Sequence, residues 1–354
     1  ELIAPTHLAK AGQILEYNSL MLSSQIAEWG GSAVTFPVVP DNSEKIQSSI
    51  KSALKDYDLV IVNAGSSAGA KDYTAHAIRS LGDIVVHGVA IKPGHPVILG
   101  IVSRKPVIGI PGYPVSAITT SELFVKPIIE KALGVQTVSR HKVKARLTRK
   151  LVSQFGNDEF IRLRLARISG DLVATAIQRG AGVIMSLVEA DGITKIPKLS
   201  EGIDSGSDIE VELIKHIDEI NNTLVMVGSH DLTIDILSNL LKKQTLKSKI
   251  TSSNIGSIAG LIALSKGEAH IAGCHLLEPI TGNYNLDYVK KHIPKIPVSI
   301  ITLVHRDQGL IVEDGNPLNI TSIADLTKED VRYVNRQRGA GTRVLLDYEL
   351  SKNR

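Results

Sequence analysis

Apolar and polar positions follow three different patterns along this chain. Before about residue 140, short apolar runs such as Leu59–Val62 and Val107–Ile110 alternate with segments of helical spacing, as in Asn18–Trp29. This alternation predicts an α/β domain with a mainly parallel sheet covered by helices on both faces. The other elements expected here are a strand over Ala33–Val39, a helix opened by Asp41-Asn42-Ser43 with Ile46, Ile50, Ala53 and Leu54 inside, and helices over Tyr73–Leu81 and Val115–Leu133.

After residue 140 the period changes from helical to alternating. Lys142–Leu147 and Ile161–Leu165 alternate polar with apolar residues, and Ser169-Gly170-Asp171 is typical of a hairpin turn into Leu172–Ile177. These segments predict a small antiparallel β-domain. Its lysines and arginines could form a basic face for a nucleic acid, but alternating strands must turn polar residues to solvent, and we favour a solvated face.

A third pattern, again of the α/β kind, begins after Asn222. Strands are expected at Leu224–Val227, Ile250–Ser253 and Ala269–Ala272, with helices over Leu232–Leu241 and from Ser257 onward. We therefore predict three domains, over residues 1–139, 140–219 and 220–354.

Composition narrows the class of protein. The formal net charge of +4, spread over 354 residues, is too small to indicate a nucleic acid or a membrane surface as the main partner. A single cysteine, Cys274, excludes an internal disulfide framework, and no apolar run is long enough for a membrane span. We expect a cytoplasmic protein. Cys274, followed by His275, is interpreted as a small buried residue at a strand end.

Three loops of the first region are suited to hold one anionic ligand. Small residues in Asn63–Gly69 follow a buried strand, so that backbone N–H groups can approach a phosphate, and Asp72 precedes the next helix. Lys92–Pro96 presents a cation on a proline-rich turn, and Pro111–Ser116 follows a second buried strand. Because ligands bind at the carboxyl ends of strands in open α/β sheets, these loops are expected to converge.

The same residues carry a family resemblance. HGVAIKPGHP followed by GIPGYPVSA resembles the molybdopterin-binding domain of the MoeA/gephyrin-type molybdopterin molybdenumtransferases, and NAGSSAGAKDY and GQILEYNSLML resemble two further motifs of that family, in the family's order. QRGAGVIMSLVEADGI in the second region resembles the family's C-terminal β-barrel. The chain departs from the family at His95, where a second lysine is usual, at Tyr113, where asparagine is usual, and at Ser66 and Ser67.

The resemblance implies an enzyme that inserts molybdate or tungstate into adenylated molybdopterin with Mg²⁺, acting as a homodimer on small-molecule ligands. By this match Asp72 and Lys92 are the catalytic candidates, and Asp72 with Asp41 would hold the metal. The ligand would be bound by Gly65, Ser66, Ser67, Gly69, Gly94, His95, Pro111, Gly112, Tyr113, Pro114 and Ser116. As an alternative, Asp72, Asp41 and Ser116 are only helix caps.

His95 and Tyr113 keep a second function open. Histidine has an ordinary pKa of about 6.5, so replacing a lysine by His95 leaves the site less cationic at neutral pH. Either a bound phosphate keeps His95 protonated or the activity is altered. The alternative hypothesis is therefore a non-catalytic sensor or scaffold that binds a pterin, molybdate or tungstate.

The third region is similar to the periplasmic-binding-protein-like fold, in particular to the LysR substrate-binding modules. Its GSHD, AGCHLL and VNRQRGAGTR segments carry this looser resemblance. Modules of this kind bind small ligands at helix N-termini, so Ser229, Ser257, Arg338, Thr342 and Arg343 are oxyanion-binding candidates, with helix capping as the alternative. By the same resemblances we expect part of the family's sequence to be missing before Glu1 and after Arg354.

Overall fold

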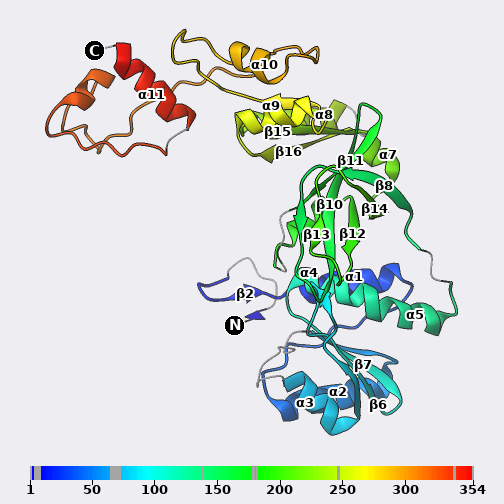
Figure 1. Cartoon of the computed structure of the whole chain (residues 1–354). Helices are drawn as coiled ribbons and strands as arrows, with labels where there is room; N and C mark the ends of the chain where they lie inside the picture. Colours follow the sequence, from blue (N-terminus) through cyan, green and yellow to red (C-terminus); the bar gives the residue numbers. More distant parts are fainter. Residues whose placement is uncertain are drawn as a thin grey trace. The chain divides into compact units, whose positions relative to one another are not determined.

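The computed structural model describes residues 2–3, 9–63, 73–136, 139–177, 180, 182–244, 248–337 and 340–352. The chain divides into two compact units (Figure 1). Unit 1 comprises Glu1–Leu165 and Ala174–His216, and unit 2 comprises Ala166–Val173 and Ile217–Arg354. Among the described residues, no helix has both the length and the apolar character needed to span a bilayer.

Unit 1 begins with an α/β domain built on a four-stranded sheet. The strand order is β3, β7, β6 and β4, formed by Val60–Asn63, Lys105–Ile110, Ile98–Val102 and Asp83–His87. Only β3 and β7 are parallel, whereas β6 runs antiparallel to both β7 and β4, so the predicted mainly parallel sheet was wrong. The physical reason is a tight turn at Ser103 and Arg104, both with positive φ (51° and 65°), which joins β6 and β7 as a hairpin.

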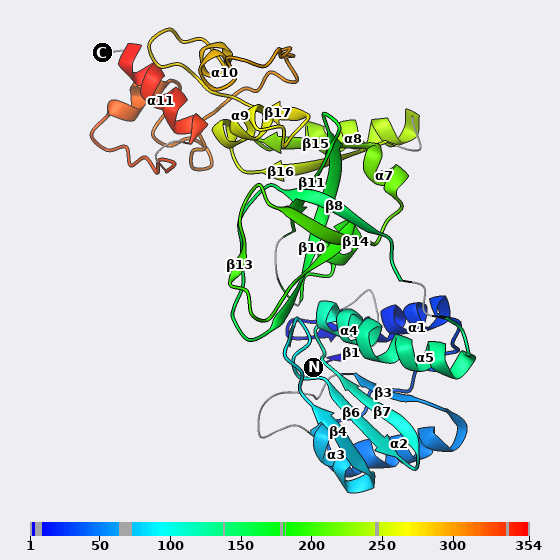
Figure 2. The ribbon, with the colours of Figure 1, turned by 45° about the vertical axis from the view of Figure 1, so that its right-hand side comes forward.

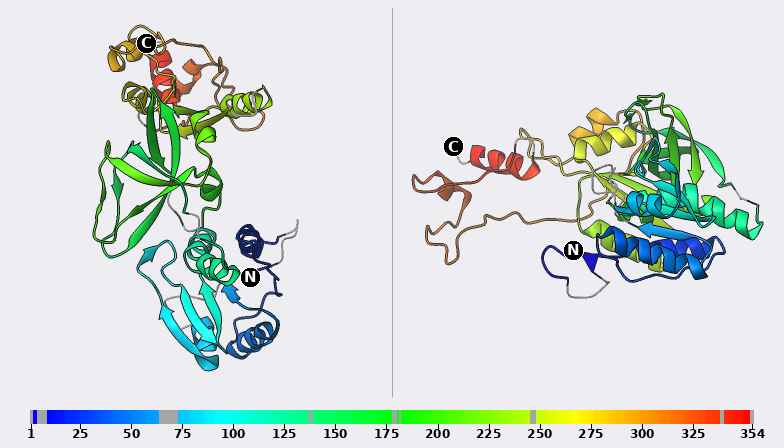
Figure 3. Two further views of the ribbon diagram at one scale, coloured as in Figure 1. Left: turned by 90° about the vertical axis from the view of Figure 1, so that its right-hand side faces the viewer. Right: turned by 90° about the horizontal axis from the view of Figure 1, so that it is seen from below.

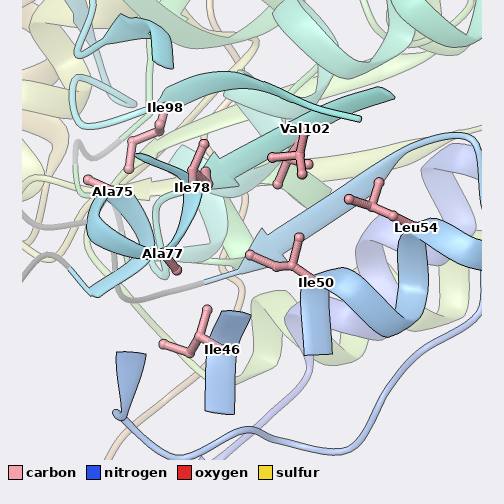
Figure 4. Close-up of a cluster of buried hydrophobic side chains, with 9 residues drawn as sticks. Ile46, Ile50, Leu54, Ala75, Ala77, Ile78, Ile98 and Val102 are labelled. Carbon is pink, nitrogen blue, oxygen red and sulfur yellow. The ribbon is translucent and has the colours of Figure 1, made fainter. Parts of the chain in front are cut away.

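Helices cover both faces of this sheet, as the β-α pattern predicted (Figure 2). On one face lie α2 (Ser43–Asp56) and α3 (Tyr73–Leu81). The cluster between them and the sheet contains the predicted inner residues Ile46, Ile50 and Leu54 of α2, together with Ala75, Ala77, Ile78, Ile98, Val102 and Val107 (Figure 4). On the other face, α1 (Asn18–Glu28) and α4 (Pro114–Thr120) bury Leu22 and Ala117 against Ile108 and Ile110.

Two local predictions differ from the structure in this domain. The strand expected over Ala33–Val39 is absent, and Val34, Phe36 and Val38 are 57%, 43% and 56% exposed. The edge strand β3 pairs with β7 alone, and this alternating segment does not pair with the open side of β3. The long helix expected over Val115–Leu133 is interrupted by a π-helical turn, Ser121–Val125, before α5 (Lys126–Leu133). Pro127 lacks the backbone N–H that a continuous α-helix would use at this position, which accounts for the interruption.

The next part of the chain is a closed antiparallel barrel (Figure 3), as predicted, and most of it belongs to unit 1. Its strands are β8 (Lys142–Leu147), β10 (Asp158–Ile168), β11 (Asp171–Ala176), β12 (Gly192–Ile196) and β14 (Asp208–Leu213), and the pairing of β11 with β10 closes it. Shorter elements of unit 1 are β1 (Leu2–Ile3), β2 (Ile14–Leu15), β5 (Ile91–Lys92), β9 (Leu151–Val152), β13 (Gly202–Ile203) and α6 (Met185–Glu189). β5 adds in parallel to the start of β10, so that the barrel and the α/β domain share one sheet edge.

Unit 2 contains a three-stranded parallel sheet in the order β16, β15, β17, formed by Lys249–Asn254, Thr223–Gly228 and Ile271–Gly273. The three predicted strands and the two helices between them, α8 (Thr233–Gln244) and α9 (Ser257–Ser265), are confirmed. Val227, Ala263 and Ala269 form its core cluster. The remaining helices are α7 (Ile217–Asn221), α10 (Leu286–His292), η2 (Ile323–Thr327) and α11 (Gly341–Lys352).

Candidate functional site

Asn18 ties together two of the predicted ligand loops of unit 1. This side chain, only 7% exposed, opens α1 and donates to the Gly112 carbonyl at 2.7 Å and to Asn63 Oδ1 at 3.3 Å. Asn63 ends β3, and Gly112 lies in the turn that follows the parallel strand β7. A single buried carboxamide therefore fixes the carboxyl ends of both strands, as the argument from strand ends predicted.

The Lys92 turn reaches the same region through Gly94. Gly94 is buried with φ +112°, and a Cβ atom there would lie 2.5 Å from Thr120 Cγ2 of α4. This contact leaves no room for a side chain, and the positive φ favours glycine independently. Gly94 therefore seats the turn directly on the helix that begins at Pro114.

His95 presents one ring nitrogen to solvent. Its Nδ1 lies 2.7 Å from the Val89 carbonyl, and the Val89 N–H donates to the His95 carbonyl at 2.9 Å. A carbonyl oxygen only accepts hydrogen bonds, so Nδ1 carries the hydrogen and Nε2 remains for a ligand. In a neutral ring Nε2 is an acceptor, which a lysine never supplies.

A recess of about 190 Å³ lies beside Lys92 and His95, and we call it the Lys92 recess. It is lined by Ile91, Lys92 and His95 of the α/β domain and by Asn157 of the barrel domain. The pairing of Ile91 with Asp158 and of Lys92 with Glu159 brings the two domains together here. The recess is open, and its exposed lining is almost entirely apolar.

Arg162 of β10 is buried, an exception to the solvated face that the basic residues of the barrel strands otherwise form, as Lys142, Lys144 and Arg167 are exposed. It is 7% exposed, and its Nε has no hydrogen-bond partner in the described part of the chain. One terminal nitrogen lies 3.4 Å from the Gly180 carbonyl, and burial lowers the pKa of the guanidinium. A Cβ atom on Gly182 would lie 3.7 Å from the Tyr113 ring, so Gly182 itself approaches the Pro111–Ser116 turn.

The other predicted residues of this site divide into three groups. Pro111, Pro114 and Ser116 are buried around the start of α4, and Tyr113 is 67% exposed. Ser116 does not cap α4, because Tyr113 occupies the N-cap position. Gly65, Ser66, Ser67, Gly69 and Asp72 lie outside the described residues.

The predicted metal ligands do not form a site within the described residues. Asp41 is exposed ahead of α2, where the neighbouring Asn42 caps the helix by accepting from the Lys45 N–H at 3.0 Å. No group of three or more acidic, histidine or cysteine side chains suited to a metal occurs in the described part of the chain. Asp72, the other expected ligand, is not among those residues.

In unit 2, two of the predicted oxyanion-binding residues meet. Ser229 Oγ and Ser257 Oγ are 2.6 Å apart, and Ser257 Oγ accepts from the His275 N–H at 3.2 Å. Ser257 is not a helix cap, since Gly256 holds the N-cap position of α9. For Ser257 the capping alternative is therefore wrong, and the two hydroxyls form a pair at the ends of β15 and β16.

The start of α11 lies against this pair through His275. A Cβ atom on Gly341 would lie 2.5 Å from His275 Nε2, while Nδ1 of the same ring is 3.4 Å from Ser257 Oγ. Thr342 is exposed, and Arg343 is held by the Arg336 carbonyl at 3.1 Å and by Asp347 at 3.6 Å. Arg338 lies outside the described residues. The structure thus places His275 beside Ser257, and does not bring the Arg343 guanidinium to Ser229 and Ser257.

Known protein families match the α/β domain, the barrel and most of unit 2. The family described as "Probable molybdopterin binding domain" matches residues 1–131, and the family described as "MoeA C-terminal region (domain IV)" matches residues 144–214. These two stretches are therefore similar to a molybdopterin binding domain and to the C-terminal region of MoeA. The family described as "PBP superfamily domain" matches residues 238–354.

Relatives and a solved structure support the MoeA-type region. A protein of Methanocaldococcus jannaschii named for molybdopterin biosynthesis is 35% identical over 205 residues, covering 58% of this chain and 48% of its own length. Molybdopterin molybdenumtransferase 2 of Mycobacterium tuberculosis is 30% identical over 220 residues, covering 60% and 53%. The crystal structure of the MoeA protein from Pyrococcus horikoshii matches with TM-score 0.52 and 36% identity, covering 61% of this chain and 52% of that one. The chain therefore spans about half the length of these relatives.

Sequence reasoning missed three residues of the two sites: Asn157, Arg162 and His275. Asn157 lines the Lys92 recess only through the pairing of β10 with β5, and Arg162 is buried at Gly180 only through the packing of the barrel, and no local pattern indicates either. His275 follows a short strand and was interpreted, with Cys274, as packing. Cys274 is indeed half-buried, and burial raises the pKa of its thiol. The sequence feature that could have indicated a role for His275 was the small size of the residues that face it, Ser257 and Gly341.

The stability of unit 2 is expected to fall on acidification through His275. Burial and then the charge of Arg306 lower the pKa of this imidazole, so below about pH 6.5 the unfolded chain binds a proton that the folded chain resists. The contribution is complete above the ordinary histidine pKa and is lost as the pH falls below it. Hydrogen exchange at residues 271–276, corrected for intrinsic rates, should therefore accelerate between pH 7.5 and pH 5.5. His275→Asn should reduce this dependence, and an equal acceleration in the variant would contradict the assignment.

Proposed function

We propose that the MoeA-type region binds adenylated molybdopterin and acts in molybdenum cofactor biosynthesis by exchanging the adenylate for molybdate. The observation that carries this proposal is the convergence of the Lys92 turn and the Pro111–Ser116 turn, fixed by Gly94 and Asn18. The similarity to a molybdopterin molybdenumtransferase supports the reaction class. Molybdate or tungstate is the incoming substrate.

The side chains of the site suit an anionic ligand. The Lys92 ammonium would offset phosphate charge, and His95 Nε2 would accept a hydrogen bond, or donate one when the ring is protonated. Arg162 would supply a second cation beside the Gly180 carbonyl. A buried cation with an unpaired donor is costly, which favours a ligand as its partner.

We propose Mg²⁺ as the divalent ion near the phosphates, with Asp72 as its main ligand and Asp41 as a second. The small-residue loop of Gly65, Ser66, Ser67 and Gly69 would place backbone N–H groups against the same phosphates. When bound, Mg²⁺ supplies charge neutralisation. The described residues do not form a metal site of three or more ligands by themselves.

His95 and the exposed Tyr113 support the alternative of a non-catalytic pterin or molybdate sensor. The two functions are separated by incubating the chain with adenylated molybdopterin, Mg²⁺ and molybdate and measuring both ligand binding and cofactor formation. Binding with formation of cofactor supports the enzyme. Binding without formation, unchanged in His95→Lys, supports the sensor, whereas activity gained in His95→Lys identifies His95 as the residue that suppresses turnover.

We propose further that the PBP-type domain binds a small oxyanion. Ser229, Ser257 and the Arg338–Arg343 segment would donate to it, with Thr342 and both arginines as candidates. Titration of the chain with molybdate, tungstate and sulfate, followed by calorimetry, tests this. Ser257→Ala should abolish the heat of binding, while Ser265→Ala at the other end of α9 should not.

The native assembly and setting are proposals as well. We infer a cytoplasmic homodimer with the domain boundaries predicted from the sequence, at residues 139/140 and 219/220. The single cysteine supports a reducing compartment. Sedimentation of the chain over a range of concentrations tests the dimer.

A further inference from the structure

Helix α8 of unit 2 exposes a row of apolar side chains on its outer face. Its inner face lies against β16, and Ile234 is buried there. Four large apolar side chains, three in the helix and one just before it, are 37% to 74% exposed: Leu232, Ile236, Leu237 and Leu240. Because residues four apart in a helix point to the same side, Leu232, Ile236 and Leu240 form one row. Exposed apolar side chains gathered on one face indicate an interaction surface.

The charges beside this row are separated by sign along the helix. Asp235 lies in the first turn of α8, and Lys242 and Lys243 lie in the last turn. All three are exposed, and none makes an ion pair with another residue in the described part of the chain. Asp235 and Lys242 are about two helical turns apart and therefore lie on the same side of the helix. The apolar row is thus bordered by an acidic group near one end and a basic group near the other.

We infer that this face of α8 is a contact between two copies of the chain, in which the two α8 helices are antiparallel about a twofold axis. Such an axis brings the apolar row against itself and places Asp235 of each copy beside Lys242 of the other. A parallel arrangement would instead bring like charges together, which is unfavourable. Because the row and its charges complement themselves, a second copy satisfies this surface without a different partner. The inference assigns a surface to the proposed homodimer and does not depend on ligand binding.

The size of this contact predicts a weak dimer. Stable protein–protein interfaces bury roughly 1,200–2,000 Å² in total. One row of exposed side chains from a 12-residue helix on each copy falls below that range. We therefore expect a dissociation constant in the micromolar range, so that the fraction of dimer depends on the concentration of the chain.

The first test replaces the central residue of the row. Ile236→Glu should raise the dissociation constant of the full chain about tenfold or more, because association would bury two carboxylates in an apolar contact. Sedimentation equilibrium from about 1 to about 100 µM chain covers the expected range. Ile280→Glu is the matched control, since it makes the same substitution at an isoleucine that is 90% exposed in the turn before α10, and it should leave association unchanged. Far-ultraviolet circular dichroism checks that each variant keeps its helices.

The second test exchanges the two charges. Asp235→Lys and Lys242→Asp alone should each weaken association about three- to tenfold, because each converts two ion pairs across the axis into like-charge pairs. The double variant Asp235→Lys/Lys242→Asp restores both pairs and should associate within about twofold of wild type. A double variant that associates as weakly as the single variants would contradict the antiparallel contact.

Three further results would overturn the inference. An equal dissociation constant for wild type and Ile236→Glu would place the homodimer contact on another surface and leave the proposed homodimer intact. An equal loss in Ile236→Glu and Ile280→Glu would show a general response to added charge. A wild-type chain that stays monomeric up to about 100 µM would overturn both this contact and the proposed homodimer. None of these results bears on the ligand site of unit 1, which is measured separately.

Discussion

Replacing Lys92 by methionine is expected to weaken the binding of adenosine monophosphate by about 10- to 100-fold, the range for losing a hydrogen bond to a charged group. The methionine keeps most of the apolar length of the side chain, so the pairing of β5 with β10 should persist. Binding measured by calorimetry at low ionic strength gives the largest difference, because salt screens an exposed ammonium.

The control for Lys92→Met is Lys51→Met, which removes the same charge from an exposed position on α2. If both variants weaken binding equally, the effect reflects net charge alone, and the Lys92 turn is not the phosphate site. A weaker response to salt in Lys92→Met than in wild type would support direct contact.

Replacing Arg162 by methionine is expected to separate stability from binding. The guanidinium is buried with an unpaired Nε, so an apolar residue of similar length should leave the free energy of unfolding unchanged or raise it. Ligand binding should nevertheless fall about 30-fold or more, as expected when one partner of a buried charge pair is removed. Urea unfolding followed by circular dichroism and calorimetric titration measure the two effects.

Arg164→Met provides the comparison on the same strand. Arg164 is paired with Glu189, and its removal should cost stability while leaving binding nearly unchanged. If Arg162→Met binds ligand as well as wild type, the buried guanidinium has a structural role only, and the second cation must be removed from the proposed site.

The local elements of unit 1 were predicted well where a helical face or an alternating strand is long enough to be specific. The inner residues of α2 and the bounds of α3 and β8 follow directly from periodicity. The direction of β6 did not, because Ser103 and Arg104 adopt positive φ without the glycine or asparagine that marks such a turn. The segment 33–39 failed for a different reason, since an alternating pattern does not by itself fix pairing, and this segment forms no ladder with β3 although β3 has an open edge.

The candidate site was predictable only within one domain. Lys92, Gly94 and the Pro111–Ser116 turn could be identified because two features of the backbone are visible in the local sequence. One is a glycine at a buried turn, and the other is a turn that follows the end of a strand. Asn157 could not, because its position beside Lys92 depends on the pairing between β5 and β10, and Arg162 could not, because its burial depends on how the barrel packs. The chemistry of His95 also required the structure, which shows that Nδ1 is committed to the Val89 carbonyl and that Nε2 is the free nitrogen.

The claim that unit 1 contains a site for a phosphate-bearing pterin adenylate is tested most directly by titrating the wild-type chain with adenylated molybdopterin in a calorimeter. We predict saturable binding with one site per chain, competed by adenosine monophosphate and weakened in Lys92→Met. The absence of saturable binding by wild type, under conditions in which Trp29 fluorescence reports a folded α/β domain, would contradict it.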